Sequence, residues 1–180
     1  DFRDIYVKGT GAPISGTRVG DLGGCTGVTF SPSKTVYWNL PSGGDWVTSV
    51  PWASTSGGVT NVNNFPLPQD VAVIENTGLN ASASITVSAT PAMFLSGIDM
   101  SSRTTAMMLS LPTSGSNVIY GDLKLGVNTT ISSSGSIVFA KEGVQTILTQ
   151  GKPVGNIEVN SIEGTVELAD ALNNGTSTIM

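Results

Sequence analysis

The sequence predicts an all-β protein with the character of a β-solenoid, similar to a parallel β-helix. Three observations favour this class. Ser, Thr, Asn and Gly supply more than a third of the 180 residues, whereas charged residues supply only 12%. Hydrophobic residues still make up 39%, with many Val and Ile, which is typical of an ordered chain rather than a disordered one. The apolar residues occur in short runs bounded by Gly, Ser, Asn or Pro, which is a strand signal.

These runs define the expected elements, and the best helical pattern, at residues 167–172, is too short to stand alone. In chain order, strands are expected at residues 4–7, 28–30, 35–40, 71–75, 84–87, 93–99, 106–111, 118–125, 136–140, 145–149, 156–160 and 164–168. In the second half, apolar groups begin at residues 98, 109, 123, 137, 147, 157 and 166. Short strands at this spacing suit a sandwich, a barrel or a solenoid.

The connectors favour the solenoid and leave a β-sandwich as the alternative. Hairpins prefer Asn-Gly or Asp-Gly turns, and the sequence has one such dipeptide, Asn174-Gly175. The other connectors are Ser-, Thr- and Gly-rich stretches such as residues 113–117, which suit the corners of stacked coils. In such a stack we expect Val, Ile and Leu to point inward, and Ser, Thr and Asn to face water. Spacing alone does not fix the direction of the strands.

The composition changes near residues 57–64 and divides the chain into two predicted parts. Residues 1–58 form an irregular β segment rich in Trp, Gly and Pro, which we expect to act as a cap or an attachment. Residues 59–180 are predicted to form solenoid rungs that continue beyond the end of the chain, because the chain looks like a piece of a longer polypeptide. Pro66 and Pro68 hold the backbone extended just before the strand at residues 71–75.

Several function classes are disfavoured by what the sequence lacks. Without His, there is no Ser-His-Asp or Cys-His catalytic arrangement, and a single Cys supplies neither a disulfide framework nor a zinc site. A net charge of −5 disfavours nucleic-acid binding. No segment reaches the ~20 consecutive apolar residues of a membrane span. We therefore expect no enzyme activity, cofactor or metal.

The three Trp residues are the main candidates for ligand binding. Trp38, Trp46 and Trp52 lie within fifteen residues of one another. Exposed indole rings would stack on the apolar faces of sugars, whereas buried rings would plug the end of the solenoid. The sequence favours the plug and keeps glycan stacking as a hypothesis.

Two acidic residues raise the question of glycan cleavage, which uses a pair of carboxylates. Glu158 and Glu167 each lie between two apolar residues, so both are expected to point away from the core. If they lie one rung apart, they share one outer face of the solenoid. The alternative is a solvated face that prevents unwanted pairing of strands.

The order of several motifs resembles a known family. The series is residues 21–30, Tyr37-Trp38, Trp46, Trp52, Gly57-Gly58, residues 64–73, 98–104, 120–125 and 164–172. It resembles large repetitive structural proteins of tailed bacteriophages, especially marine ones, which have fibre-like, appendage or tail-associated roles and β-solenoid-like repeats. The resemblance covers residues 1–172.

This resemblance implies a location in the virion and a mechanical role. A stiff β-rich rod would support host attachment, with other virion proteins as partners and a homotrimer as the expected assembly. A host-surface glycan is a further candidate partner. Two alternatives stay open: a carbohydrate-binding or adhesin module, and a polysaccharide-depolymerising spike. The family supplies no catalytic motif that maps onto this chain.

Overall fold

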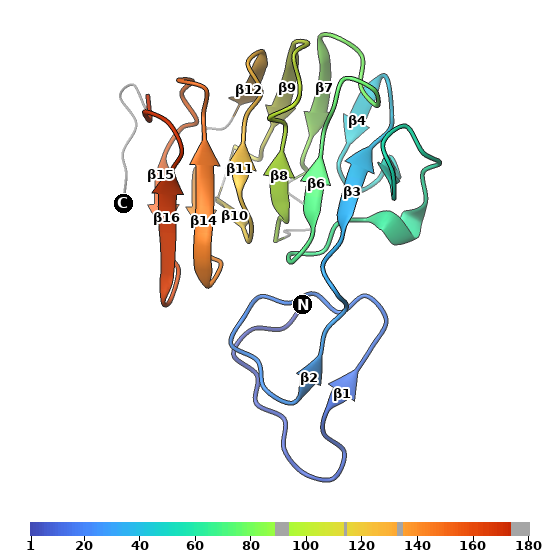
Figure 1. The fold of residues 1–180 in the computed structure, drawn as a ribbon, viewed down its shortest axis with the longest axis vertical. Coiled ribbons are helices and arrows are strands. Elements are labelled where there is room, and N and C mark those ends of the chain that lie inside the picture. The colour runs from blue at the N-terminus through green and yellow to red at the C-terminus, as the bar shows by residue number, and fades with distance from the viewer. Residues whose placement is uncertain (89–93, 114, 133–134, 174–180) are drawn as a thin grey trace.

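The protein is an all-β molecule whose strands stack into a parallel β-solenoid (Figure 1). The computed structural model describes residues 1–88, 94–113, 115–132 and 135–173. Within these ranges the one helical element is a short 3-10 helix, η1, at Val62–Asn64. The predicted fold class is confirmed, because about four turns of solenoid span residues 71–168 and the strands run parallel where a sandwich would be antiparallel.

The strands form four sheets. In spatial order, the seven-stranded sheet contains β16 (Gly164–Leu168), β14 (Gly143–Leu148), β11 (Leu123–Lys124), β8 (Gly97–Asp99), β6 (Val71–Val73), β3 (Thr35–Trp38) and β5 (Trp52–Ala53). The four-stranded sheet contains β12 (Thr129–Ser132), β9 (Met107–Ser110), β7 (Ala83–Thr86) and β4 (Gly43–Asp45). The three-stranded sheet contains β10 (Ser116–Ile119), β13 (Ser136–Phe139) and β15 (Ile157–Val159). The remaining pair is β1 (Ile14–Ser15) and β2 (Val28–Thr29).

Between β8 and β14 the chain visits the three larger sheets in turn, so the coils in this part of the solenoid have three faces. From β8 it passes to β9, β10 and back to β11 in the first sheet. The register pairs Ile98 with Leu123, Leu123 with Ile147 and Ile147 with Leu168, so a coil takes 25, 24 and then 21 residues. Every strand pairing among the described residues is parallel except that of β3 with β5.

The core is built from rows of apolar side chains that run along the stack. In the seven-stranded sheet, one buried row consists of Val36, Ala72, Ile98, Leu123 and Ile147. Alternation along each strand points these residues inward and their neighbours outward. Full burial of a Leu or Ile side chain contributes roughly 1.5–3 kcal/mol, so a continuous row stabilises the stack along its whole length.

The N-terminal segment, residues 1–34, lies beside the stack rather than within it (Figure 1). Where the sequence predicts a strand at residues 4–7, the structure has a single parallel bridge from Tyr6 to Thr26. The predicted strand at residues 93–99 begins at Met93, which lies outside the described residues. The composition change near residue 58 falls within residues 46–70, the long connection from β4 to β6.

Candidate functional site

The three Trp residues come together at the first coil of the solenoid. Trp38, Trp46 and Trp52 are each only 1% exposed. The ring of Trp52 packs edge-to-face against both others, with centroid distances of 5.4 Å to Trp38 and 4.6 Å to Trp46. Its Nε1–H donates to the carbonyl oxygen of Trp46 at 3.1 Å, so the polar atom is satisfied inside the core. This arrangement is that of a core plug, and the burial of all three side chains does not favour stacking of a sugar on an indole face.

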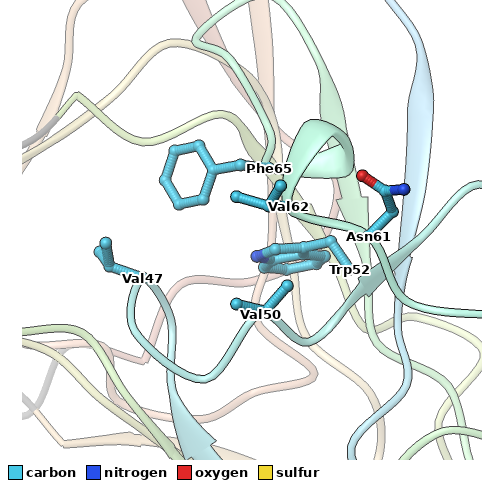
Figure 2. A pocket seen from close by; sticks show the side chains of 6 residues that line it. All are labelled: Val47, Val50, Trp52, Asn61, Val62 and Phe65. Carbon is cyan, nitrogen blue, oxygen red and sulfur yellow. The ribbon is translucent and has the colours of Figure 1, made fainter.

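An apolar hollow of about 190 Å³ borders this plug. It is lined by Val47, Val50, Trp52, Asn61, Val62 and Phe65. Figure 2 shows the valines and the phenylalanine gathered around the indole of Trp52. The side-chain oxygen of Asn61 accepts a hydrogen bond from the Asn63 N–H and caps η1, which fixes this wall of the hollow.

Two cations lie beside the hollow. Arg18 donates hydrogen bonds to the carbonyl oxygens of Asn63 and Phe65, and Lys34 donates to Asn63 at 3.0 Å. Burial and the nearby charge of Arg18 lower the pKa of Lys34, and Asp70 partly opposes them. The local surface is therefore basic, although the whole chain is acidic.

A polar groove runs where the N-terminal segment meets the seven-stranded sheet. It consists of two adjoining hollows of about 220 Å³ each, which share Gln69, Tyr120 and Lys141. Gly97 and Gly121 line it on adjacent coils. A Cβ on Gly121 would lie 2.4 Å from the Gly97 Cα, so the close approach of the two coils requires glycine there.

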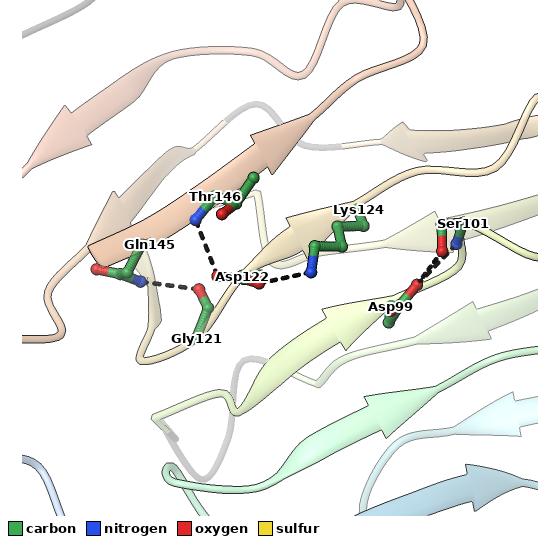
Figure 3. A network of polar contacts seen from close by, with 7 residues as sticks. All are labelled: Asp99, Ser101, Gly121, Asp122, Lys124, Gln145 and Thr146. Atoms are coloured by element: carbon green, nitrogen blue, oxygen red, sulfur yellow. Dashed lines mark hydrogen bonds and ion pairs between the residues drawn. The ribbon is translucent and has the colours of Figure 1, made fainter. Parts of the chain in front are cut away.

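Charged side chains line this groove on two neighbouring coils, each in its own set of polar contacts (Figure 3). Asp122 accepts a hydrogen bond from the Thr146 N–H at 2.8 Å and forms an ion pair with Lys124 at 2.7 Å. On the preceding coil, Asp99 accepts hydrogen bonds from the N–H and hydroxyl of Ser101. The hydrogen bond with Asp122 raises the pKa of Lys124 against the effect of burial, and the charges of Asp122 and Asp99 add to it. The groove therefore presents charged hydrogen-bond donors and acceptors on successive coils of the solenoid.

Two buried polar side chains hold the turns between faces, and the sequence analysis missed both. Arg103 is fully buried and donates to the carbonyl oxygens of Glu75, Leu79, Asn80 and Ala106 at 2.7–3.3 Å. Gln145 is also buried and donates to the carbonyl oxygens of Ile119 and Gly121. An Arg or Gln next to a predicted corner is a weak signal, because such residues are usually exposed. Both act structurally, by binding carbonyl groups that the corners leave unpaired.

Glu158 and Glu167 do not form a carboxylate pair. Glu158 lies in β15 of the three-stranded sheet, and Glu167 lies in β16 of the seven-stranded sheet. The chain turns a corner between these strands, so the condition for a shared outer face, that the two residues lie one rung apart, is not met. Nor do the described residues contain any group of three or more His, Cys, Asp or Glu side chains placed to hold a metal ion.

Comparison with known proteins adds no relative. No family model, curated protein or solved structure matches the chain. Among the described residues, no helix is long and apolar enough to cross a membrane.

Proposed function

We propose that this chain is a structural component of a tailed-phage virion, in a fibre, appendage or tail-associated position. It provides a stiff β-rich rod that supports host attachment. The observation that carries this proposal is the continuous in-register row from Val36 to Ile147, which crosses five strands and is buried throughout. The location in a virion rests on the resemblance of the sequence motifs to structural proteins of tailed phages. The same resemblance is the basis for expecting other virion proteins as partners and a homotrimer as the assembly.

The solenoid suits a mechanical role because its bonds run along the long axis of the stack. Hydrogen bonds of the seven-stranded sheet join each coil to the next, and the four-stranded and three-stranded sheets add ladders along part of the stack, so bending the rod strains more than one sheet at once. The acidic side chains also serve the scaffold. Asp70 accepts hydrogen bonds from the backbone N–H groups of Lys34 and Leu67. Carboxylates of this kind hold the corners of the coil in place, because their oxygens accept hydrogen bonds from backbone N–H groups.

Antibody labelling of purified virions tests this proposal. An antibody raised against the folded chain should place gold particles on the tail or on projecting appendages in electron micrographs. The same antibody must detect the protein in immunoblots of the infected lysate, which shows that the reagent works. Detection in the lysate combined with bare particles would contradict a virion location.

The polar groove favours a second candidate function, that of a carbohydrate-binding module. Lys124 and Asp99 on neighbouring coils, with Lys141 at the rim, present the kinds of groups that hydrogen-bond sugar hydroxyls. Calorimetric titration with host-surface polysaccharide should then show saturable binding that Asp99→Asn and Lys141→Ala both weaken. Met108→Ala, on the outer face of a different sheet, is the matched control. If none of the three substitutions changes the affinity, the groove is not the binding site.

A further inference from the structure

The polar groove presents more acidic than basic groups. Its two hollows are lined by five carboxylates and two ammonium groups, those of Asp21, Asp70, Asp99, Asp122 and Glu142 against Lys124 and Lys141. Arg3 reaches the Tyr120 hydroxyl at 3.5 Å, but its charge is matched by Asp4 at 3.4 Å. Lys34 lies close enough to interact with Asp70, and even with it the carboxylates outnumber the cations. The field of the groove therefore disfavours an anionic ligand.

The acids of the first hollow are largely engaged by the protein. Asp70 binds backbone N–H groups with both of its oxygens. Asp122 accepts from a backbone N–H with one oxygen and pairs with Lys124 through the other. Asp99 uses one oxygen for both bonds from Ser101, and in the described part of the chain its second oxygen has no hydrogen-bond partner. This hollow can therefore accept from, and donate to, the hydroxyl groups of a sugar.

The second hollow contains the carboxylate that the protein leaves unpaired. Among the residues that the structure describes, the side chains of Glu142 and Lys141 form no hydrogen bond or ion pair. Gly23 leaves room for the Glu142 carboxylate, because a Cβ there would lie 3.0 Å from its Oε1. Asp21 lines the same hollow and uses one oxygen to accept from the Gly23 N–H at 2.9 Å. Two carboxylates with open oxygens favour a positively charged donor, which forms the stronger kind of hydrogen bond.

We propose that the groove binds a glycan with a free amino group, whose ammonium lies in the second hollow at Glu142 and Asp21. This class of ligand rests on the carbohydrate-binding function proposed above for the groove. In the first hollow, Asp99 and Lys124 bind sugar hydroxyls, and Lys141, which both hollows share, donates to a sugar oxygen. An acidic sugar would bring its own carboxylate against Glu142 and Asp21. The groups that attract an amino sugar therefore also reject a uronic acid.

Calorimetric titration with tetrasaccharides of glucosamine, N-acetylglucosamine and galacturonic acid tests this class. The first two share one backbone, and acetylation removes the charge of the amino group. The glucosamine form should bind about tenfold more tightly than the acetylated form, because a hydrogen bond between charged groups is worth about this factor. The galacturonic acid form should not bind. Added salt should weaken the glucosamine form more than the acetylated form.

Two variants locate the ammonium. Glu142→Gln and Asp21→Asn keep the shape of the side chain and remove its charge. Each should weaken binding of the glucosamine form by about tenfold and leave the affinity for the acetylated form nearly unchanged. The control is Glu158→Gln, the same change in β15 of the three-stranded sheet and outside the groove, which should alter neither affinity. Far-UV circular dichroism verifies that each variant is folded.

The outcomes separate the amino-sugar class from the carbohydrate-binding function. Equal or tighter binding of the acetylated or galacturonic acid form overturns the amino-sugar class alone, as does a preference for the amino form that Glu142→Gln leaves intact. Spermidine that binds as tightly as the glucosamine form also overturns it, because charge alone is then recognised. If only host-surface polysaccharide binds, its chemical N-acetylation should lower the affinity by the same factor, and an unchanged affinity overturns the class. If no saccharide binds, the carbohydrate-binding function itself is wrong.

Discussion

The coils after residue 34 and the segment before it are stabilised in different ways. The coils are held by parallel ladders on three faces and by buried apolar rows. The segment has one two-residue strand pair, isolated bridges such as Phe2 to Asp21, and a single residue, Leu22, among the buried hydrophobic side chains. The coils therefore supply their own stability, whereas the segment depends on its contact with them.

That contact is concentrated on one side chain of the stack. Gln69 donates to the carbonyl oxygens of Val19 and Ser31, both at 3.1 Å, and accepts from the Asp21 N–H at 2.9 Å. Its neighbour Asp70 accepts hydrogen bonds from the N–H of Lys34, where the segment joins β3, and from the N–H of Leu67. Two successive residues thus have different roles, since Gln69 holds the body of the segment and Asp70 holds its junction with the first coil. The predictions below separate these two kinds of stabilisation, beginning with the largest effect.

The largest effect is expected at the plug that starts the core. Trp52→Ala removes a buried ring that packs against both Trp38 and Trp46. Large-to-small changes of buried Trp cost about 3–5 kcal/mol. Urea denaturation should show this loss in the free energy of unfolding. Val59→Ala, in the same connection but exposed, should change it by less than about 0.5 kcal/mol. Equal losses of unfolding free energy for both substitutions would contradict the interpretation of the Trp cluster as a core plug.

A matched pair of leucines in one row tests how burial varies along the stack. Leu123→Ala, in the middle, should cost about 2–5 kcal/mol, because Leu123 is buried between Ile98 and Ile147. Leu168→Ala makes the same chemical change at the exposed end of the row and should cost well under half as much. The measurement is urea denaturation at concentrations where the chain is monomeric. Comparable losses at both positions would mean that the last coil is covered.

The fold class and the inward rows followed from the sequence because both depend on local pattern. Short β-branched runs and Ser/Thr/Gly connectors predict the coils, and the row through Ile98 and Leu123 has the inward direction that alternation predicts. The number of faces per coil was not predictable in this way. Apolar groups that begin at residues 157 and 166 look like successive rungs, yet they lie on two faces of one turn. For this reason the shared outer face of Glu158 and Glu167, which the sequence left open as a hypothesis, does not occur.

The buried polar side chains could not be predicted from the sequence either. Arg103 and Gln145 look like ordinary surface residues, and only the meeting of distant corners buries them. The antiparallel β5 beside β3 depends on how residues 46–70 return over the first coil, which no local pattern specifies. The burial of the three Trp residues, in contrast, agrees with the plug that their clustering favoured.

A smaller effect is expected where the segment joins the coils. Gln69→Ala removes three hydrogen bonds to residues 19–31, at groups that water partly reaches, so the global loss should be about 1 kcal/mol. The local effect should be larger, because the segment has little core of its own. Limited proteolysis should cut residues 1–33 faster in the variant and leave the coils intact. Cleavage that is unchanged in the variant would show that Arg18 and Leu22 suffice to hold the segment.

The smallest effect on stability is expected at acidic pH, where the carboxylate of Asp170 becomes protonated. The hydrogen bond from the backbone N–H of Thr149 is the main cause that lowers the pKa of Asp170 below its ordinary 3.8. Burial, the next largest effect, opposes it, and hydrogen bonds from the Gly151 N–H and the Thr149 hydroxyl lower the pKa further. Since the folded-state pKa lies below the unfolded one, this carboxylate stabilises the fold above pH 3.8, and the contribution disappears as pH falls through the lowered value. Asp170→Asn should therefore flatten the fall of the unfolding free energy in acid. Because Asp170 follows β16, the last strand of the seven-stranded sheet, the change should stay local to the last coil. A pH profile identical to that of the wild type would mean that the N–H groups of the last turn do not depend on this charge.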